Sequence, residues 1–219
     1  MWPAVAKPRR VVAKPRRVVV KLRPAIAKSR RAVAKLAGLA LALLLLSACG
    51  RVAPVVKVGL AAPFEGRQRA VGYDVIYSAR LAVREINAAG GIGGYRVALV
   101  ALDDGADPEL ARDAAASLVI DPRVVAVVGH WQPQTTAVAA PIYAAAGLAF
   151  WPAGATTDPA DLDPAFVAAY EAVTPFDETP GPYAGPAYAA FQELWETLAR
   201  AHAASGVIDR AGVYAAGQN

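Results

Sequence analysis

The chain of 219 residues carries 23 basic and 18 acidic side chains and a single cysteine, which excludes an internal disulfide. The formal net charge of +5 arises within residues 1–48, which hold twelve Lys and Arg and no Asp or Glu. The remaining 11 basic and 18 acidic residues give residues 49–219 a net charge of −7. This acidic balance excludes a basic surface for a nucleic-acid partner.

The first 48 residues have the layout of a lipoprotein signal peptide with an extended basic leader. An apolar run of eleven residues, Leu36 to Leu46, is too short to span a bilayer and leads into Leu46-Ser47-Ala48-Cys49. This ending resembles the bacterial lipobox, so we expect lipidation at Cys49, with a chance buried cysteine as the alternative. The expected location is exported and lipid-anchored to the cell membrane, facing the periplasm or extracellular side.

Basic repeats recur at a spacing of seven within residues 6–24. They allow two interpretations, a nucleic-acid-binding arm or an overlong basic leader. The leader is favoured because the segment directly precedes the apolar run of the signal.

The first half of the remaining chain alternates predicted strands with amphipathic helices. A buried strand at 55–60 and a polar loop at 66–71 precede a helix that ends at Gly90-Gly91. The apolar face of this helix is expected to comprise Val71, Val75, Ala79, Val83 and Ile86. A second strand at 96–102 and a helix beginning near Pro108 follow, and the inward-facing residues of that helix are expected to be Leu110, Ala114 and Leu118.

The same alternation continues up to Trp151. The run 124–128 is β-branched except for Ala126, as expected of a strand covered on both faces. A helix at 134–146, with Val138, Ile142 and Ala145 on one side, then leads to a strand at 148–151. After a break come a short helix at 165–172, an irregular stretch at 174–186 and an amphipathic helix at 185–204, whose apolar face is expected to hold Tyr188, Phe191, Trp195 and Leu198.

Strands that alternate with helices predict an α/β fold, a parallel sheet with helices on both faces. Five segments in this order resemble the type I periplasmic binding proteins, most closely the branched-chain amino-acid receptors of ABC importers: 56–60, 79–94, 103–108, 127–130 and 155–156. The resemblance implies the first lobe of that fold with a C-terminal helical segment. It also implies a solute-binding protein that is not an enzyme and needs no cofactor or metal.

The C-terminal part resembles the end of such a receptor, not its middle. The segments 166–170, 182–184 and 187–190 carry this similarity, whereas full-length receptors clamp their ligand between two lobes. We therefore expect an N-terminal α/β lobe at 49–162 and a C-terminal helical closing segment at 163–219, with the second lobe largely missing. A genuine short protein and a fragment of a longer one both fit this pattern.

The turn Gln132–Thr136 is a candidate ligand site, since it opens a helix whose free N–H groups can hold a carboxylate. The family uses a small hydroxyl residue here for the α-carboxylate of an amino acid. Pro133 aligns best with that residue and offers neither hydroxyl nor N–H, so the resemblance leaves Gln134, Thr135 and Thr136 as substitutes.

Three further groups of candidate residues follow other predicted strands. The resemblance assigns the Ala155 carbonyl and the Thr156 hydroxyl to the ammonium or amide of the ligand, while helix capping by Thr156 or Thr157 is the alternative. Trp131 and Trp151 could form an apolar wall around the ligand. In the first loop, Arg67 and Arg69 either pair with an anionic ligand or are simply solvated.

Three titratable residues also follow strands. Asp103 and Asp104 could form a Mg²⁺ or phosphoryl-acceptor pocket, as in a receiver domain, or a loop that caps the helix at Pro108. His130 could be a general base or a loop histidine held by backbone hydrogen bonds. The bland interpretation is favoured in both cases, because the chain is expected to be exported and no nucleophile lies in a recognisable elbow.

The sequence thus predicts an extracytoplasmic solute-binding lipoprotein that captures a small polar solute, such as an amino acid or amide, for an ABC permease. Its partners would be that solute, the permease and, through the lipid anchor, the membrane. The alternatives are a one-lobe sensing or scaffold protein that acts through a partner and, less favoured, a receiver-like phospho-acceptor.

Overall fold

The computed structural model describes residues 52–176 and 178–218, and residues 53–219 form one compact unit. The predicted signal segment 1–48, the basic repeats and Cys49 lie outside the described residues. None of the helices that the structure describes is long and apolar enough to cross a membrane.

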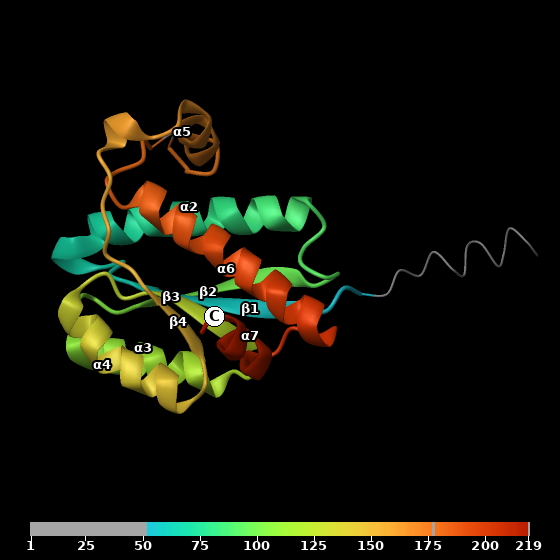
Figure 1. Ribbon diagram of the computed structural model, residues 1–219. Helices are drawn as coiled ribbons and strands as arrows, with labels where there is room; N and C mark the ends of the chain where they lie inside the picture. The colour runs from blue at the N-terminus through green and yellow to red at the C-terminus, as the bar shows by residue number, and fades with distance from the viewer. Residues whose placement is uncertain (1–51, 177, 219) are drawn as a thin grey trace, which may run out of the picture. The chain divides into compact units, whose positions relative to one another are not determined.

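The core of this unit is a four-stranded parallel sheet with the order β2-β1-β3-β4 (Figure 1). Its strands are β1 (Val55–Ala62), β2 (Arg96–Asp103), β3 (Val124–Gly129) and β4 (Ala149–Pro152). The chain reverses its direction of winding between β1 and β3, and ligands of open parallel sheets bind at the carboxyl ends of strands at such a switch point. The predicted α/β fold class is confirmed.

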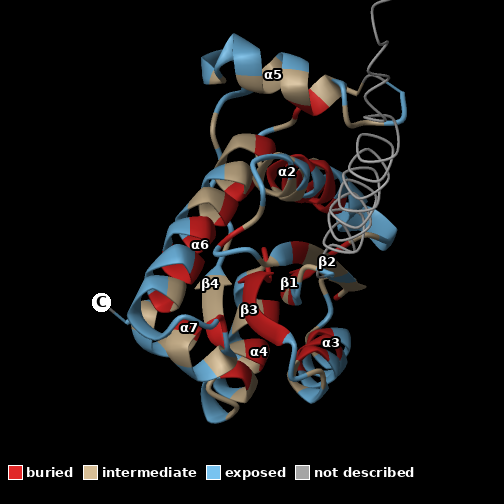
Figure 2. Cartoon of the chain, turned by 90° about the vertical axis from the view of Figure 1, so that its right-hand side faces the viewer, coloured by how far each residue is buried: buried red, intermediate tan, exposed pale blue. Residues whose placement is uncertain are grey.

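Helices cover both faces of the sheet. α2 (Arg69–Ala88) and α6 (Ala184–Ser205) lie on one face, and α3 (Pro108–Ile120) and α4 (Pro133–Ala145) lie on the other (Figure 1). β3 is buried along its whole length, as its β-branched sequence predicts for a strand covered on both sides (Figure 2).

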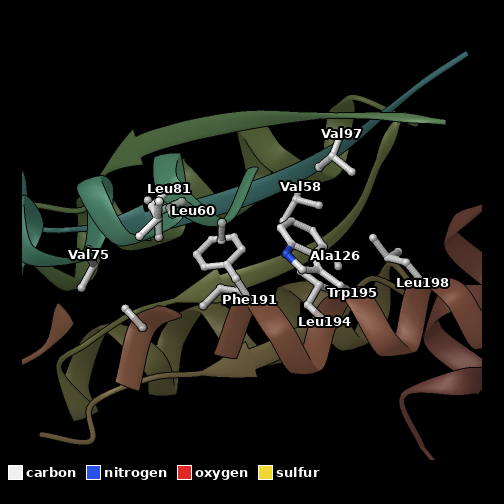
Figure 3. Close-up of a cluster of buried hydrophobic side chains, with 14 of the residues drawn as sticks. Val58, Leu60, Val75, Leu81, Val97, Ala126, Phe191, Leu194, Trp195 and Leu198 are labelled. Carbon is white, nitrogen blue, oxygen red and sulfur yellow. The ribbon is translucent and has the colours of Figure 1, made fainter. Parts of the chain in front are cut away.

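The larger apolar cluster fills the space between β1, α2 and α6. Figure 3 shows Phe191, Trp195 and Leu198 of α6 directed toward Val58 and Leu60 of β1. Apart from Tyr188, which is only half-buried, the predicted apolar face of α6 is confirmed as core.

The inward face of α3 differs from the prediction by one residue. Ala114 and Leu118 are buried as expected, but Leu110 is 48% exposed and Ala111 takes its place in the core. The helix begins at Pro108, and the Asp107 side chain accepts hydrogen bonds from the backbone N–H groups of Glu109 and Leu110. Asp107, rather than Asp103 or Asp104, is therefore the cap.

The side of α4 that carries Val138, Ile142 and Ala145 is not its inward face. Val138 and Ile142 are half-buried and Ala145 is exposed, whereas the buried side chains are Thr135, Ala139 and Tyr143. Nearly every residue of this helix is apolar or small, so hydrophobic periodicity carries little information about which side faces the sheet.

The C-terminal part consists of α5 (Pro164–Glu171), α6 and α7 (Arg210–Ala216), with a 3₁₀ turn at Pro159–Asp161 before α5. A second 3₁₀ turn, Gly66–Gln68, occupies the predicted polar loop, and α2 begins directly after it. Helix α7 has no counterpart in the sequence prediction. Its Arg210 guanidinium donates hydrogen bonds to the carbonyl oxygens of Val119, Asp121 and Val124 at 2.9–3.1 Å, which ties α7 to the end of α3 and the start of β3.

Candidate functional site

The predicted site residues follow β1, β3 and β4, and only part of the set comes together. Trp131 and Ala155 line a common cavity of about 290 Å³ with Trp151 and residues of α6, among them Ala187 and Glu193. This volume lies near the lower end of small-ligand pockets, which measure about 300–1,000 Å³. The cavity is mostly apolar, and sequence reasoning did not place α6 beside it.

Trp131 is 4% exposed and therefore forms a wall inside the protein and not an exposed rim. Its indole Nε1 has no hydrogen-bond partner in the described part of the chain. A buried indole N–H is usually hydrogen-bonded, so this group is an unused donor next to the cavity.

The α4 turn after Trp131 is held by its own hydroxyl groups. Thr135 Oγ1 donates a hydrogen bond to the Gln132 carbonyl oxygen at 2.9 Å, and Thr136 Oγ1 donates one to the His130 carbonyl oxygen at 2.7 Å. Both hydroxyl protons are thus used within the turn, which leaves only oxygen lone pairs for a ligand. The Gln134 side chain is exposed, and its backbone N–H lies in the first turn of α4, where helical N–H groups lack intrahelical partners.

Thr156 is exposed after β4, and its hydroxyl makes no hydrogen bond to any residue that the structure describes. Neither Thr156 nor Thr157 caps a helix, so the capping alternative is wrong. Asp158 caps the following turn by accepting from Ala160 N–H at 2.9 Å. Thr157 instead donates its backbone N–H to the Pro182 carbonyl oxygen at 2.9 Å.

Arg67 and Arg69 are exposed in the turn and the first residue of α2. They do not line the Trp131 cavity, and within the described ranges neither forms an ion pair. A larger cavity of about 470 Å³ lies between α2, α5 and α6 and contains none of the predicted site residues.

Asp103 and Asp104 have different structural roles. Asp103 Oδ1 accepts hydrogen bonds from Phe64 N–H at 2.7 Å and Gly105 N–H at 3.0 Å. Asp104 is fully buried, and a fully buried carboxylate cannot meet a phosphodonor. No group of three His, Cys, Asp or Glu side chains in the described part of the chain could hold a metal ion. The receiver-like alternative therefore has no accessible acceptor at Asp104.

His130 is also fully buried, so it cannot act as a general base on a solute. Its ring is held by side chains instead of the backbone groups expected from the sequence. Nδ1 lies 2.9 Å from Asp104 Oδ2, and Nε2 lies 3.0 Å from the Tyr143 hydroxyl oxygen. Burial, followed by the nearby Asp104 carboxylate, raises the pKa of Tyr143, so the tyrosine keeps its proton.

Tyr143 belongs to the buried polar cluster around His130, and sequence reasoning missed it. In the structure, Thr135, Ala139 and Tyr143 recur every four residues on the inward face of α4, but the sequence carried no signal for that face because nearly every side chain of this helix is apolar or small. Tyr143 is the only one of the three with a polar group long enough to reach a neighbouring loop.

Comparison with known proteins places this chain in a family. A sequence model described as a periplasmic binding protein matches residues 55–164. An amino acid binding protein from Pseudomonas aeruginosa is 38% identical over 93 residues, which cover 42% of this chain and 25% of that protein. Leu/Ile/Val-binding protein homolog 2 from Brucella abortus is 36% identical over 104 residues, covering 48% and 28% of the two chains.

Among solved structures, the chain is similar to the branched-chain amino acid transporter substrate binding protein from Streptococcus pneumoniae, determined in complex with isoleucine. The identity is 35%, the match covers 48% of this chain and 30% of that chain, and the TM-score is 0.44. The chain spans about a quarter of the length of the curated relatives named above. Because the family model matches 110 of the 219 residues, which is half of the chain, the protein belongs to the periplasmic binding protein family.

Proposed function

We propose that the protein is a solute-binding protein of an ABC importer that captures a small amphipathic solute, an amino acid or its amide. The observation that carries this proposal is the cavity lined by Trp131 and Ala155 at the carboxyl ends of β3 and β4, where Trp131 lies two residues before the start of α4. In a parallel sheet this edge is the usual place of a ligand. The names of the relatives, which include amino acid and Leu/Ile/Val-binding proteins, support the same class of solute.

The chemistry of the cavity suits an amino acid with an apolar side chain. Trp131 and Trp151 offer apolar surface for that side chain. The α-carboxylate would lie at the start of α4, where the Gln134 N–H and the positive end of the helix dipole favour an anion. The ammonium group would contact the Ala155 carbonyl and the free Thr156 hydroxyl, as the family resemblance implies.

The proposal extends to the cell surface. We infer that residues 1–48 direct export, that Cys49 is lipidated and that the bound solute passes to an ABC permease in the membrane. We also infer that residues 49–162 correspond to the first lobe of the receptors and residues 163–219 to their closing segment. A scaffold role would leave the cavity without a solute, so it is the outcome expected if binding is absent.

Titration calorimetry against L-leucine, L-isoleucine, L-valine and L-leucinamide tests the proposal. We expect saturable heat with at least one of these solutes, and weaker binding in Thr156→Ala because the free hydroxyl is lost. Thr179→Ala is the matched control, since Thr179 is also exposed but lies in the loop before α6. Equal binding by all three proteins would remove Thr156 from the site, and no heat with any solute would contradict the function.

A further inference from the structure

Three buried polar side chains form a continuous hydrogen-bonded network beneath the α4 turn. Asp104 comes from the loop after β2, His130 from the end of β3 and Tyr143 from α4, and all three are fully buried. His130 lies between the other two, 2.9 Å from Asp104 Oδ2 and 3.0 Å from the Tyr143 hydroxyl oxygen. The contacts therefore join three separate elements at the carboxyl edge of the sheet.

The direction of the hydrogen bonds follows from the chemistry of the groups. An ionised carboxylate only accepts, so Nδ1–H of His130 donates to Asp104. The tyrosine keeps its proton, because burial and the Asp104 carboxylate raise the pKa of Tyr143, and in the neutral imidazole with Nδ1 protonated its hydroxyl donates to Nε2. Asp104 Oδ1 additionally accepts a hydrogen bond from Ala106 N–H at 3.0 Å, which anchors the Asp104 end of the network.

This network of side chains fixes a residue with an unusual backbone conformation. His130 has φ +41°, in the left-handed region that side-chain-bearing residues rarely adopt. Its backbone N–H donates to the Ala61 carbonyl oxygen at 3.0 Å, and its carbonyl oxygen accepts from Thr136 Oγ1 at 2.7 Å. Gly129 before it has φ +145°, and a Cβ there would lie 2.2 Å from the Ala61 carbonyl oxygen. The strained junction leads directly into Trp131 and the α4 turn.

Stability alone does not explain these three residues. Their surroundings are apolar, with the Phe150 ring centroid 6.0 Å from that of His130 and 4.9 Å from that of Tyr143. Well-packed apolar residues in place of a buried polar network are often at least as stabilising, whereas a satisfied network specifies one arrangement of the elements it joins. The arrangement specified here is the position of the turn that follows His130.

We propose that Asp104, His130 and Tyr143 are positioning residues that set the affinity of the Trp131–Thr136 turn for an amino-acid solute. The inference rests on the proposed function, since it assigns this network of side chains to the same site. None of the three touches the solute, because none is exposed. They act by holding the left-handed backbone of His130, from which the turn begins.

The variant Tyr143→Phe removes one hydroxyl from the network. L-leucine is the probe. We expect its dissociation constant for L-leucine to rise about fivefold, the effect of losing one net hydrogen bond of about 1 kcal/mol. Tyr188→Phe is the matched control, because the Tyr188 hydroxyl also bonds to a side chain, Glu85 Oε2, but lies on α6 beside the other cavity. Its affinity for L-leucine should equal that of the wild type. An unchanged affinity in Tyr143→Phe overturns the proposal.

Nitrogen-15 NMR of histidine separates positioning from a purely structural role. The chain contains two histidines, so His202→Gln assigns the signals of His130. We expect protonated Nδ1 and unprotonated Nε2 at His130, and a shift of its Nε2 signal as L-leucine saturates the wild-type protein, because coupling between two sites is reciprocal. A His130 spectrum that does not respond to bound L-leucine contradicts the proposal.

The inference and the proposed function can fail separately. If the wild-type protein binds no amino acid, the proposed function is wrong, and amide hydrogen exchange decides the positioning role. Tyr143→Phe must then accelerate exchange at Thr135 and Thr136, whose N–H groups bond to the Gln132 carbonyl, and Tyr188→Phe must not. If Tyr143→Phe does not fold, Asp104→Asn takes its place in every measurement, since its amide oxygen still accepts from Nδ1, and we expect about a threefold loss of affinity. Exchange rates equal to those of the wild type overturn the inference.

Discussion

Single carboxylates connect distant parts of this chain. Asp74 on α2 accepts hydrogen bonds from the backbone N–H groups of Gly181 and Tyr183, at 3.1 and 3.2 Å, and so holds the loop before α6. A Cβ at position 181 would lie 2.3 Å from Asp74 Oδ2, so any other residue there would displace the Asp74 carboxylate. At the opposite edge of the sheet, Asp121 pairs with Lys57 of β1 at 2.5 Å.

The two carboxylates are expected to have opposite effects on pH-dependent stability. Desolvation by burial raises the pKa of Asp74 above its usual 3.8, although its backbone hydrogen bonds oppose the shift. The contribution of Asp74 to the free energy of unfolding is therefore fully present below pH 3.8 and is lost as the pH rises through the raised pKa of the folded state. The hydrogen bond from Lys57 lowers the pKa of Asp121 to about 2, so its stability is complete above pH 3.8 and is lost as pH falls toward 2.

Thermal melts of Asp74→Asn and Asp121→Asn from pH 2 to 7 test this pair, with each variant the control for the other. The difference in Tm between wild type and Asp74→Asn should shrink as pH rises above 3.8. The difference for Asp121→Asn should shrink as pH falls below 3.8. Parallel curves for the two variants would show that the assigned directions are wrong.

Cys49 supports a second prediction at this scale, which follows from the sequence of the signal segment. Cys49→Ala should abolish incorporation of labelled palmitate and move the protein from the membrane fraction to the soluble fraction. Ser47→Ala keeps a small residue before the cysteine and should leave both properties unchanged. Identical fractionation of Cys49→Ala and wild type would rule out the lipobox.

At the scale of the elements, β3 is the strand on which the fold depends most. Val127 is fully buried and pairs with Gly59 of β1 and Phe150 of β4. Val127→Asp places an unpaired charge in this core, and we expect a loss of about 4 kcal/mol or more, enough to unfold a domain of this size.

Circular dichroism and thermal melting check this prediction, with Ile120→Asp as the control. Ile120 is a β-branched residue that is 81% exposed at the end of α3, so the same introduced charge should change little there. A soluble Val127→Asp protein that melts cooperatively would contradict the central role of β3.

Helix α7 depends on one side chain for its attachment. Arg210→Ala leaves the carbonyl oxygens of Val119, Asp121 and Val124 without their shared donor, and we expect a loss of about 2 kcal/mol because these bonds involve a charged group. Hydrogen exchange in residues 210–216 should accelerate. Arg112→Ala changes an exposed arginine on α3 and should leave the exchange unchanged. Equal exchange in both variants would mean that apolar packing alone holds α7.

The elements could be predicted from the sequence wherever a pattern had a single solution. The β-branched run of β3 and the Pro108 start of α3 are of this kind, and the structure confirms both. The inward face of α4 could not be read, because nearly every side chain of that helix is apolar or small. α7 was missed because it is short, and a long-range contact of Arg210 holds it in place.

The candidate site shows the same division. The edge of the sheet where Trp131 and Ala155 line a common cavity followed from the order of the strands and helices. The partners of His130 did not, because Asp104 and Tyr143 are 26 and 13 residues away in sequence and meet it only in the folded chain. The apolar cavity also needs α6, which arrives from the distant C-terminal part of the chain.

At the scale of the whole molecule, the affinity for a solute should reflect how much of the ligand this chain can cover. The cavity is lined only by segments near the ends of β3 and β4 and by α6, and the chain spans about a quarter of the length of its relatives. The receptors that it resembles close two lobes over the ligand and bury most of its surface. A single lobe supplies fewer contacts, while the cost of immobilising the ligand stays nearly the same.

We therefore expect this chain to bind L-leucine with a dissociation constant of about 0.1–10 mM, which corresponds to roughly −3 to −5 kcal/mol. An NMR titration with L-leucine measures affinities in this range, and D-leucine is the control for binding without stereochemical recognition. Light scattering on the same samples reports whether the binding species is a monomer, since a second copy could cover the open side of the ligand. Submicromolar binding by a monomer would contradict the one-lobe interpretation, because the described cavity would then have to bury nearly all of the solute by itself.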